Sequence, residues 1–458
     1  MTRGLVLSLA LAGSLSVVGS SWADTRGQII PQAQAQAHGL TRAWMAQFEA
    51  IGLRSKLKSL VLYEGMLVAQ TDRGGLCAYD AETGRPIWDS AKQIGNPKHP
   101  SLDPDVGGNL VAVVNGSRLY LLNRWTGDVL WERLVDGAVG AGAALSERSV
   151  YVTLVNGMVI AYPIKYATES ASNGSARAKP VEGQEPPAPP SREDLRLVQR
   201  PAPPLSCYSN GRSLVQPLVT RQTEDEDLLV WPTELGYLMV AKLDRLNVEF
   251  TLRYRLKTTR EVVGRPAYLP PDPSVAGDSG IIYGVSHDGI VHAIQEKTGQ
   301  YLWRFSTAEQ VDESAAVVDD KVYVATMFGG MFCLDAQTGA LQWRTPNVTK
   351  LLSASQDRLY AVDRLQNLLI LDRKTGQRLD TMSIVAHPFR LQNLQTDRIY
   401  LASETGLIQC LHEVGQATPL QHGADRRPAA KPKPAAKEEP AADAQPAAAQ
   451  PEAKPENQ

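Results

Sequence analysis

A short phrase recurs along this chain: an acid or amide residue, two variable residues, Thr-Gly, and then a Trp four residues after the glycine. Its glycine and tryptophan pairs are Gly84 with Trp88, Gly127 with Trp131, Gly299 with Trp303, and Gly339 with Trp343. A further copy contains Gly376 but has Asp380 in the position of the Trp. Neighbouring glycines are 43, 40 and 37 residues apart. A repeat with a period of roughly 40 residues predicts an array of similar units that bury a shared core.

Weaker units fill the gaps between these copies. Before each phrase the chain has a strand, a turn with glycine and a second strand, as in 322–334, and the same pattern recurs at 150–161, 228–241 and 399–410. A small or apolar residue ends the second strand just before the phrase, at eight equivalent positions: Ala78, Leu121, Ala161, Ala241, Ala293, Cys333, Ile370 and Cys410. We therefore predict an all-β fold, a single β-propeller of four-stranded blades, with eight blades and seven as the alternative.

The expected strands are apolar on both faces. The segments 110–114 and 281–283 show little alternation of apolar and polar residues. A blade that lies between two neighbouring blades buries both faces of its strands, so this pattern agrees with a propeller.

The Thr-Gly phrase has a structural explanation. Glycine readily adopts the positive φ of a tight turn, and Asp or Asn can hydrogen-bond the turn backbone. The tryptophan that follows buries a large ring, which we expect to pack between adjacent blades. We therefore assign a blade-docking role, not a ligand-binding role, to Trp88, Trp131, Trp303, Trp343, Gly84, Gly127, Gly299, Gly339 and Gly376.

The last blade lacks an outer strand, because the chain after 410–412 loses its apolar pattern and has no Thr-Gly-Trp phrase. The segment 42–48, ahead of the first blade, resembles the outer strands around other tryptophans and contains Trp44. Pairing the two ends would remove an exposed sheet edge. We predict that this N-terminal strand closes the ring and that Trp44 is its docking residue.

The ends of the chain differ from the repeats. Residues 1–23 have one basic residue, a short apolar stretch and a small-residue cleavage site, which predicts a cleavable signal peptide. The stretch is too short to span a bilayer, no cysteine near the cleavage site can accept a lipid, and no later segment is a membrane span. We expect an exported protein of the periplasm or cell envelope, with an N-terminal lead-in at 24–39 and a propeller at 40–414.

Two segments have compositions that do not support a packed core. A Pro-rich stretch at about 168–204 is predicted to be a disordered insertion in the propeller. The end of the chain, 415–458, is rich in Ala, Pro, Lys and Glu and is predicted to be a disordered spacer.

Charge and motifs exclude several classes of function. The 47 basic and 49 acidic residues give a net charge of −2, which argues against nucleic-acid binding. Four scattered cysteines indicate neither a disulfide framework nor a reactive site, and we expect no catalytic residue, metal ligand or cofactor-binding residue. The run Ser286-His287-Asp288 is interpreted as a hairpin turn, because consecutive residues cannot converge as a catalytic triad.

The phrase resembles the tryptophan-docking repeat of pyrroloquinoline-quinone (PQQ) type propellers, over about 39–414. That family includes quinoprotein dehydrogenases, sensor propellers and BamB, the propeller of the outer-membrane barrel-assembly machinery. The dehydrogenases hold PQQ with calcium and a catalytic Asp, and many have a disulfide between adjacent cysteines, which this chain lacks.

The resemblance therefore implies a BamB-like, non-enzymatic scaffold for protein–protein interaction in the cell envelope, with a partner such as an outer-membrane barrel-assembly protein. We expect a monomer with no cofactor. The alternatives are a PQQ/calcium-dependent quinoprotein dehydrogenase and a ligand-sensing propeller. No motif identifies the partner or the face of the ring that binds it.

Overall fold

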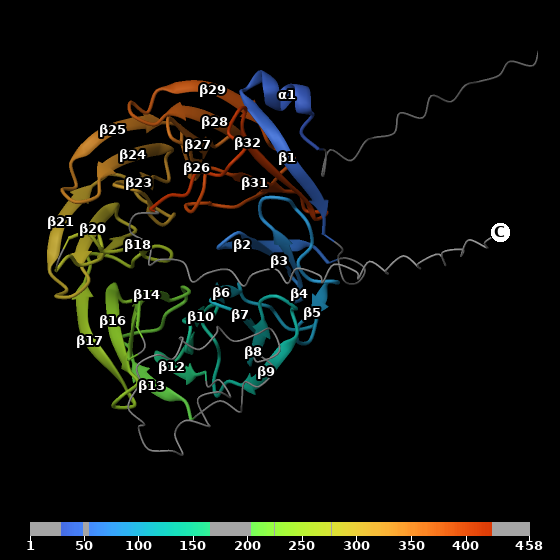
Figure 1. Cartoon of the computed structure of the whole chain (residues 1–458). Coiled ribbons are helices and arrows are strands. Elements are labelled where there is room, and N and C mark those ends of the chain that lie inside the picture. Colours follow the sequence, from blue (N-terminus) through green and yellow to red (C-terminus); the bar gives the residue numbers. More distant parts are fainter. Residues whose placement is uncertain (1–28, 49–54, 165–202, 224, 276, 424–458) are drawn as a thin grey trace, which may run out of the picture.

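The chain forms a ring of antiparallel sheets around a common axis (Figure 1). The computed structural model describes residues 29–48, 55–164, 203–223, 225–275 and 277–423. These residues form eight four-stranded sheets and one short helix, α1 (Gln32–Ala37), in the region expected as the lead-in. The prediction of an eight-bladed β-propeller is therefore confirmed.

Several predicted segments are not part of this description. The signal peptide at 1–23, most of the insertion at 168–204, and the tail from 424 onward lie outside the described residues. Within the described ranges, no helix is long and apolar enough to span a membrane.

Each blade runs outward from the axis in four strands. The innermost strands of blades 1 to 8 are β2 (Leu57–Tyr63), β6 (Asp105–Gly107), β10 (Ala144–Leu145), β14 (Leu218–Gln222), β18 (Ala267–Leu269), β22 (Ala316–Val318), β26 (Lys350–Ala354) and β30 (Phe389–Arg390). The second strands are β3 (Met66–Thr71), β7 (Leu110–Asn115), β11 (Ser149–Thr153), β15 (Glu226–Pro232), β19 (Ile281–Val285), β23 (Lys321–Ala325), β27 (Arg358–Val362) and β31 (Ile399–Ala402). The third strands are β4 (Gly75–Asp80), β8 (Arg118–Asn123), β12 (Met158–Pro163), β16 (Tyr237–Asp244), β20 (Ile290–Gln295), β24 (Gly330–Asp335), β28 (Asn367–Asp372) and β32 (Leu407–Glu413). The outermost strands are β5 (Lys92–Gln93), β9 (Val129–Leu134), β13 (Leu205–Tyr208), β17 (Glu249–Lys257), β21 (Tyr301–Ser306), β25 (Leu341–Pro346), β29 (Arg378–Ser383) and β1 (Leu40–Gln47).

The core lies between the blades. Every residue of β3 and of β7 is buried, as expected for strands with a neighbour on each face. Val68 of blade 1 packs in one apolar cluster with Val111 and Val113 of blade 2. The outermost strand β21 instead alternates between half-buried and exposed residues, because only one of its faces meets the next blade. All eight positions aligned from the sequence lie in the third strands.

The N-terminal strand closes the ring, as predicted. β1 pairs antiparallel with β32, with Leu40 opposite Glu413 and Trp44 opposite Cys410. Blade 8 therefore consists of β30, β31 and β32 from the end of the described chain and β1 from its start. The blue β1 and the red β32 lie side by side in Figure 1.

The ring has two faces that differ in their connections. One face, called here the Thr-Gly face, has the turns from the first to the second strand and from the third to the outermost strand. The other, called here the connection face, has the turns from the second to the third strand and the links from each blade to the next.

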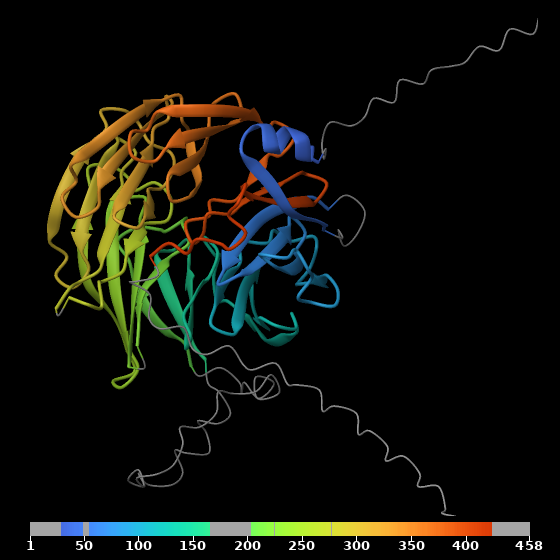
Figure 2. The same ribbon diagram turned by 45° about the horizontal axis from the view of Figure 1, so that its top comes forward.

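Residues 414–423, called here the C-terminal strap, cross the Thr-Gly face of blades 8, 7 and 6. Arg398, which is 1% exposed, donates to the carbonyls of Gln416 and Ala417 at 3.0 and 2.7 Å. Further on, His422 is buried and its Nε2 lies 2.7 Å from the carbonyl of Ala354. In Figure 2 this red segment runs from blade 8 toward the middle of the ring. The sequence assigns these residues to the tail, but polar contacts pack them onto the propeller.

Candidate protein-binding site

Tryptophan rings of one blade cover the Thr-Gly turn of the next. The indole Nε1 of Trp88 donates a 2.7 Å hydrogen bond to the carbonyl of Arg124 in blade 2, and the ring lies on Gly127. A Cβ atom on Gly127 would lie 2.7 Å from the indole, and this residue has a φ of +72°, so the contact and the turn both require glycine. The same arrangement joins Trp44 to Gly84, Trp303 to Gly339, and Trp343 to Gly376.

The acid that begins the phrase holds the turn together. The Oδ1 atom of Asp80 accepts hydrogen bonds from the backbone N and the hydroxyl of Thr83, at 2.8 and 2.9 Å. Asp335 binds Thr338 in the same way, and Asp372 binds Thr375. These contacts explain why the phrase has an acid or amide oxygen three residues before the threonine.

Two members of the predicted docking set differ from this arrangement. Gly299 is covered by Tyr254, whose hydroxyl donates to the carbonyl of Glu296 at 2.7 Å. Trp131 points toward blade 3, where no Thr-Gly phrase follows β12, and its buried Nε1 has no acceptor within the described ranges. Blade 4 has Tyr254 in place of the tryptophan, so a search for the Thr-Gly-Trp phrase does not detect its contact with Gly299.

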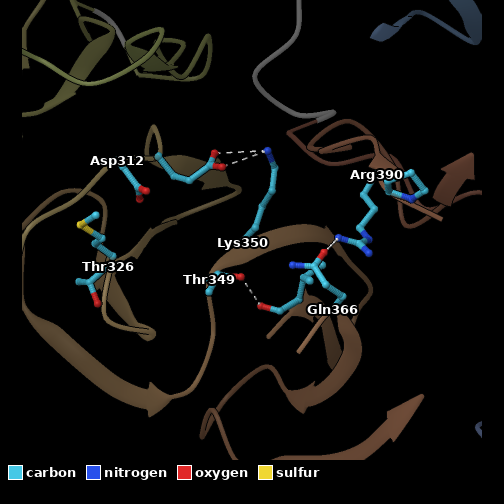
Figure 3. A pocket seen from close by; sticks show the side chains of 10 residues that line it. Asp312, Thr326, Thr349, Lys350, Gln366 and Arg390 are labelled. Carbon is cyan, nitrogen blue, oxygen red and sulfur yellow. Dashed lines mark hydrogen bonds and ion pairs between the residues drawn. The ribbon is translucent and has the colours of Figure 1, made fainter. Parts of the chain in front are cut away.

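The connection face contains a polar hollow of about 240 Å³ over blades 6, 7 and 8 (Figure 3). Its walls come from the links that lead into each of these blades, the starts of β26 and β30, and the turns that follow β23 and β27. The labelled residues in Figure 3 are Asp312, Thr326, Thr349, Lys350, Gln366 and Arg390. Their side chains converge from three blades that are consecutive in the ring.

The two cations in the hollow have different partners. Lys350 Nζ lies 3.4 and 3.3 Å from the two carboxylate oxygens of Glu313, so its charge is balanced within the protein. Arg390 donates to the uncharged Oε1 of Gln366 and to the carbonyl of Ile384 at 3.3 Å. Its buried Nε has no acceptor among the residues that the structure describes.

Burial lowers the pKa of Arg390, and the charge of Asp363 partly opposes this effect. The carboxylate of Asp363 is itself engaged, because its oxygens accept from the backbone N and the side-chain amide of Asn367 at 2.8 and 3.0 Å. Arginine keeps its proton in proteins, so the lowered pKa marks a half-buried cation whose charge is poorly balanced.

Exposed apolar residues adjoin, in the sequence, residues that line or bond the hollow. Phe328 is 61% exposed, Leu365 77% and Val385 60%. Phe328 follows Met327, which lines the hollow, Leu365 precedes Gln366, and Val385 follows Ile384, whose carbonyl binds Arg390. We call Met327, Phe328, Leu365 and Val385 the apolar rim. Exposed apolar side chains that gather beside polar groups mark surfaces that bind other proteins.

No motif in the sequence predicts this site. Its residues do not share a spacing, because they come from turn tips and blade links of three different repeats. One signal was available: Met327-Phe328 and Leu365 occupy turns where a solvent-exposed loop would have polar residues.

The cysteines and the Ser-His-Asp run have structural positions. Cys77, Cys207, Cys333 and Cys410 are buried, and they form no disulfide with one another. Burial raises the pKa of the Cys333 thiol to about 12, so it is protonated and unreactive at neutral pH. Ser286 donates to Asp288 at 2.5 Å within the turn between β19 and β20, as the sequence predicted for a hairpin.

Sequence comparison finds relatives with two kinds of name. The chain is 22% identical to the outer membrane protein assembly factor BamB of Yersinia pestis over 298 residues, which are 61% of this chain and 64% of that protein. It is 27% identical to the dehydrogenase subunit of the quinone alcohol dehydrogenase of Gluconobacter oxydans over 138 residues, which are 26% of this chain but 17% of that protein. The chain thus spans less than two thirds of either relative.

Structure comparison finds the same fold. BamB from Moraxella catarrhalis superimposes with a TM-score of 0.56 at 14% identity, over 82% of this chain and 98% of that one. The computationally designed protein Ika8 has a TM-score of 0.54 at 13% identity, over 80% of this chain.

The family profile described as outer membrane protein assembly factor BamB matches residues 35–190 and 287–404, which make up more than half of the sequence. The second matched range includes blades 6 and 7, which form part of the wall of the hollow. The chain therefore belongs to the PQQ-repeat family of the outer membrane protein assembly factor BamB.

Proposed function

We propose that this protein is a non-enzymatic scaffold of the cell envelope that binds another protein through its connection face and serves outer-membrane protein assembly. The observation that carries this proposal is the apolar rim beside the polar hollow of blades 6 to 8. A rigid ring holds these turns in place, so binding needs little reordering of the surface.

The names of the relatives support the assembly role, and the predicted signal peptide at 1–23 supports export to the periplasm. We propose that the protein acts as a monomer and is held at its partner by protein contacts.

The quinoprotein alternative finds little support in the described residues. No three His, Cys, Asp or Glu side chains in these ranges lie close enough to hold a metal ion. In the hollow, Glu313 is paired with Lys350, and Asp312 is exposed. A calcium-bound quinone therefore does not fit this donor set.

The size of the hollow also argues against a ligand-sensing role. Its volume of about 240 Å³ is below the roughly 300 to 1,000 Å³ of ordinary small-molecule pockets. It suits one or two side chains of a polypeptide better than a cofactor.

The proposal is tested by titration calorimetry of the full chain with the periplasmic region of the barrel-assembly protein from the same organism. We expect the double variant Phe328→Asp/Leu365→Asp to weaken binding at least about tenfold, because it places charges in the apolar rim. The matched control is Leu246→Asp/Val248→Asp, which changes two exposed apolar residues, 74% and 65% exposed, on the Thr-Gly face.

Equal binding by both double variants would contradict the assignment of the connection face. No binding by the unaltered chain would contradict the assembly role. A quinone-dependent dye-reduction assay with PQQ and calcium, run on the same preparation, should give no turnover; turnover would overturn the scaffold proposal.

A further inference from the structure

Among the described residues, Arg390 is the cation of the hollow that has no carboxylate bonded to it, although the charge of Asp363 lies near enough to act on it. Lys350 and Glu313 form a pair, whereas the bonded partners of Arg390, Gln366 and the carbonyl of Ile384, are uncharged. The guanidinium Nε is buried and finds no acceptor in the described chain. Such a half-buried charge is stabilised when a carboxylate approaches from outside, because guanidinium and carboxylate match in a two-bond geometry.

The surroundings of Arg390 leave it accessible to a ligand. It lies on the innermost strand of blade 8, and Figure 3 shows its side chain on the wall of the hollow next to Gln366. Gln366 is exposed, on the turn between β27 and β28, so its amide can be displaced without opening the core.

The apolar rim adds a second requirement. Leu365 is next to Gln366 in the sequence, and Val385 is next to Ile384, so each of the two residues that bond Arg390 has an exposed apolar neighbour. When an acidic residue of the partner reaches Arg390, the partner residues beside it contact the apolar rim. Burying these contacts would exclude water from the ion pair and strengthen it.

We infer that the hollow binds an acidic side chain of the partner protein, whose carboxylate pairs with Arg390 in place of Gln366, while apolar residues beside that acid cover Leu365, Val385 and Phe328. This inference rests on the proposed function and names the chemistry of the partner segment. The occupant is a protruding Glu or Asp within an apolar stretch.

Three substitutions test the inference in the full chain, two that should weaken binding and one that should not. Arg390→Gln removes the cation and should weaken binding of the periplasmic region of the barrel-assembly protein at least about tenfold, since a buried ion pair is broken. Gln366→Glu keeps the arginine but supplies an internal carboxylate, and it should weaken binding as well. Gln366→Ala, which releases the guanidinium, should retain or strengthen binding.

The control for charge loss is Arg378→Gln, an exposed arginine on the outermost strand of blade 7. It should leave affinity unchanged. Melting temperatures of all variants show whether each one folds. If Arg390→Gln does not fold, Gln366→Glu still tests the inference.

A labelled peptide with one glutamate between leucine and phenylalanine, and its glutamine counterpart, separate this inference from the proposed function. Fluorescence polarisation should show tighter binding of the glutamate peptide, and Arg390→Gln should abolish the difference. If the barrel-assembly region does not bind but the peptides behave this way, the assembly role fails and the acidic site stands.

If the barrel-assembly region binds equally to the unaltered chain, Arg390→Gln and Gln366→Glu, the acidic site is wrong and the assembly role stands. If neither probe binds, both proposals are overturned.

Discussion

The imidazole Nδ1 of His38 and the carboxylate Oδ2 of Asp380 lie 2.7 Å apart at the junction of blades 7 and 8. Asp380 occupies the position in β29 where other copies of the phrase have Trp. Blade 8 has no Thr-Gly turn to receive an indole, because its third strand ends at Glu413 and its outermost strand comes from the start of the chain. Between blades 7 and 8, a polar contact therefore replaces the tryptophan contact found at other blade junctions.

This contact should contribute little to stability. The hydrogen bond from His38 lowers the pKa of Asp380, but the Asp380 side chain is 42% exposed, so Asp380→Asn should cost at most about 1 kcal/mol. Because the folded pKa is below the unfolded one, this contribution is present at neutral pH and disappears as the carboxylate becomes protonated in acid. Urea unfolding at pH 7 and pH 3 measures it. Asp357→Asn, in an exposed pair with Lys374, is the control and should have no effect.

Glycine in the docking turn should be required for two separable reasons. Gly84 and Gly65 both have a positive φ, +69° and +75°, but a Cβ atom would lie 2.5 Å from Trp44 at Gly84 and meet nothing within 4 Å at Gly65. We expect Gly65→Ala to cost about 1 to 2 kcal/mol from backbone strain alone. Gly84→Ala should cost about 1 to 3 kcal/mol more, because the indole must move. If urea unfolding gives the same loss of unfolding free energy for both variants, the packing of Trp44 does not require glycine at position 84.

The C-terminal strap should stabilise the ring. A chain that ends after Glu413 loses the bonds from Arg398 to Gln416 and Ala417 and leaves that buried guanidinium without these acceptors. Its melting temperature should fall by several degrees, since each lost bond costs roughly 0.5 to 3 kcal/mol. A chain that ends after Gly423 is the control and should melt like the full chain. If both truncated chains melt alike, the strap contributes nothing to stability.

The end of the strap should also respond to acid through Asp319. Hydrogen bonds from His422 and Arg373 and from the backbone N of Gly423 lower the pKa of Asp319 well below its usual value. Its stabilising effect is therefore present above about pH 4, the unfolded pKa, and is lost as pH falls further. Asp319→Asn should be less stable than the unaltered chain at pH 7, and the difference should shrink in strong acid. A difference that does not change with pH would contradict this account.

Protonation of a buried histidine should destabilise blade 5. His292 is 2% exposed, and burial together with the charge of Arg304 lowers its pKa to about 4. The unfolded chain binds this proton near pH 6.5, so stability present above that pH is lost as pH falls toward 4, by up to about 3 kcal/mol. His292→Gln should flatten this part of the pH profile in thermal unfolding, whereas substitution of the exposed His99 should not.

The blades could be predicted because each repeat encodes the same local structure. The strand, glycine turn and strand before Asp80, Asp335 and Asp372 depend on residues that are neighbours in sequence, so their pattern recurs and can be aligned. The closing role of Trp44 was accessible for the same reason, because its strand resembles the other outermost strands.

The hollow and the strap could not be predicted in this way. Arg390, Gln366 and Lys350 meet only because three blades are adjacent in the ring, and no spacing in the sequence reports that geometry. The strap has few apolar residues, and its packing depends on single polar contacts with Arg398 of blade 8 and Asp319 of blade 6. Composition alone therefore places these residues in the tail.

The pairing of Leu40 with Glu413 also sets the order in which the fold can form. Blade 8 needs strands from both ends of the described chain, so β1 has no partner for its backbone hydrogen bonds until β32 has been made. Contacts between such distant residues close late, because the loop between their ends must first be constrained. Seven blades can stack as the chain emerges, but the ring becomes a single cooperative unit only at the last repeat, and until then its first strand is an open edge that other chains can bind.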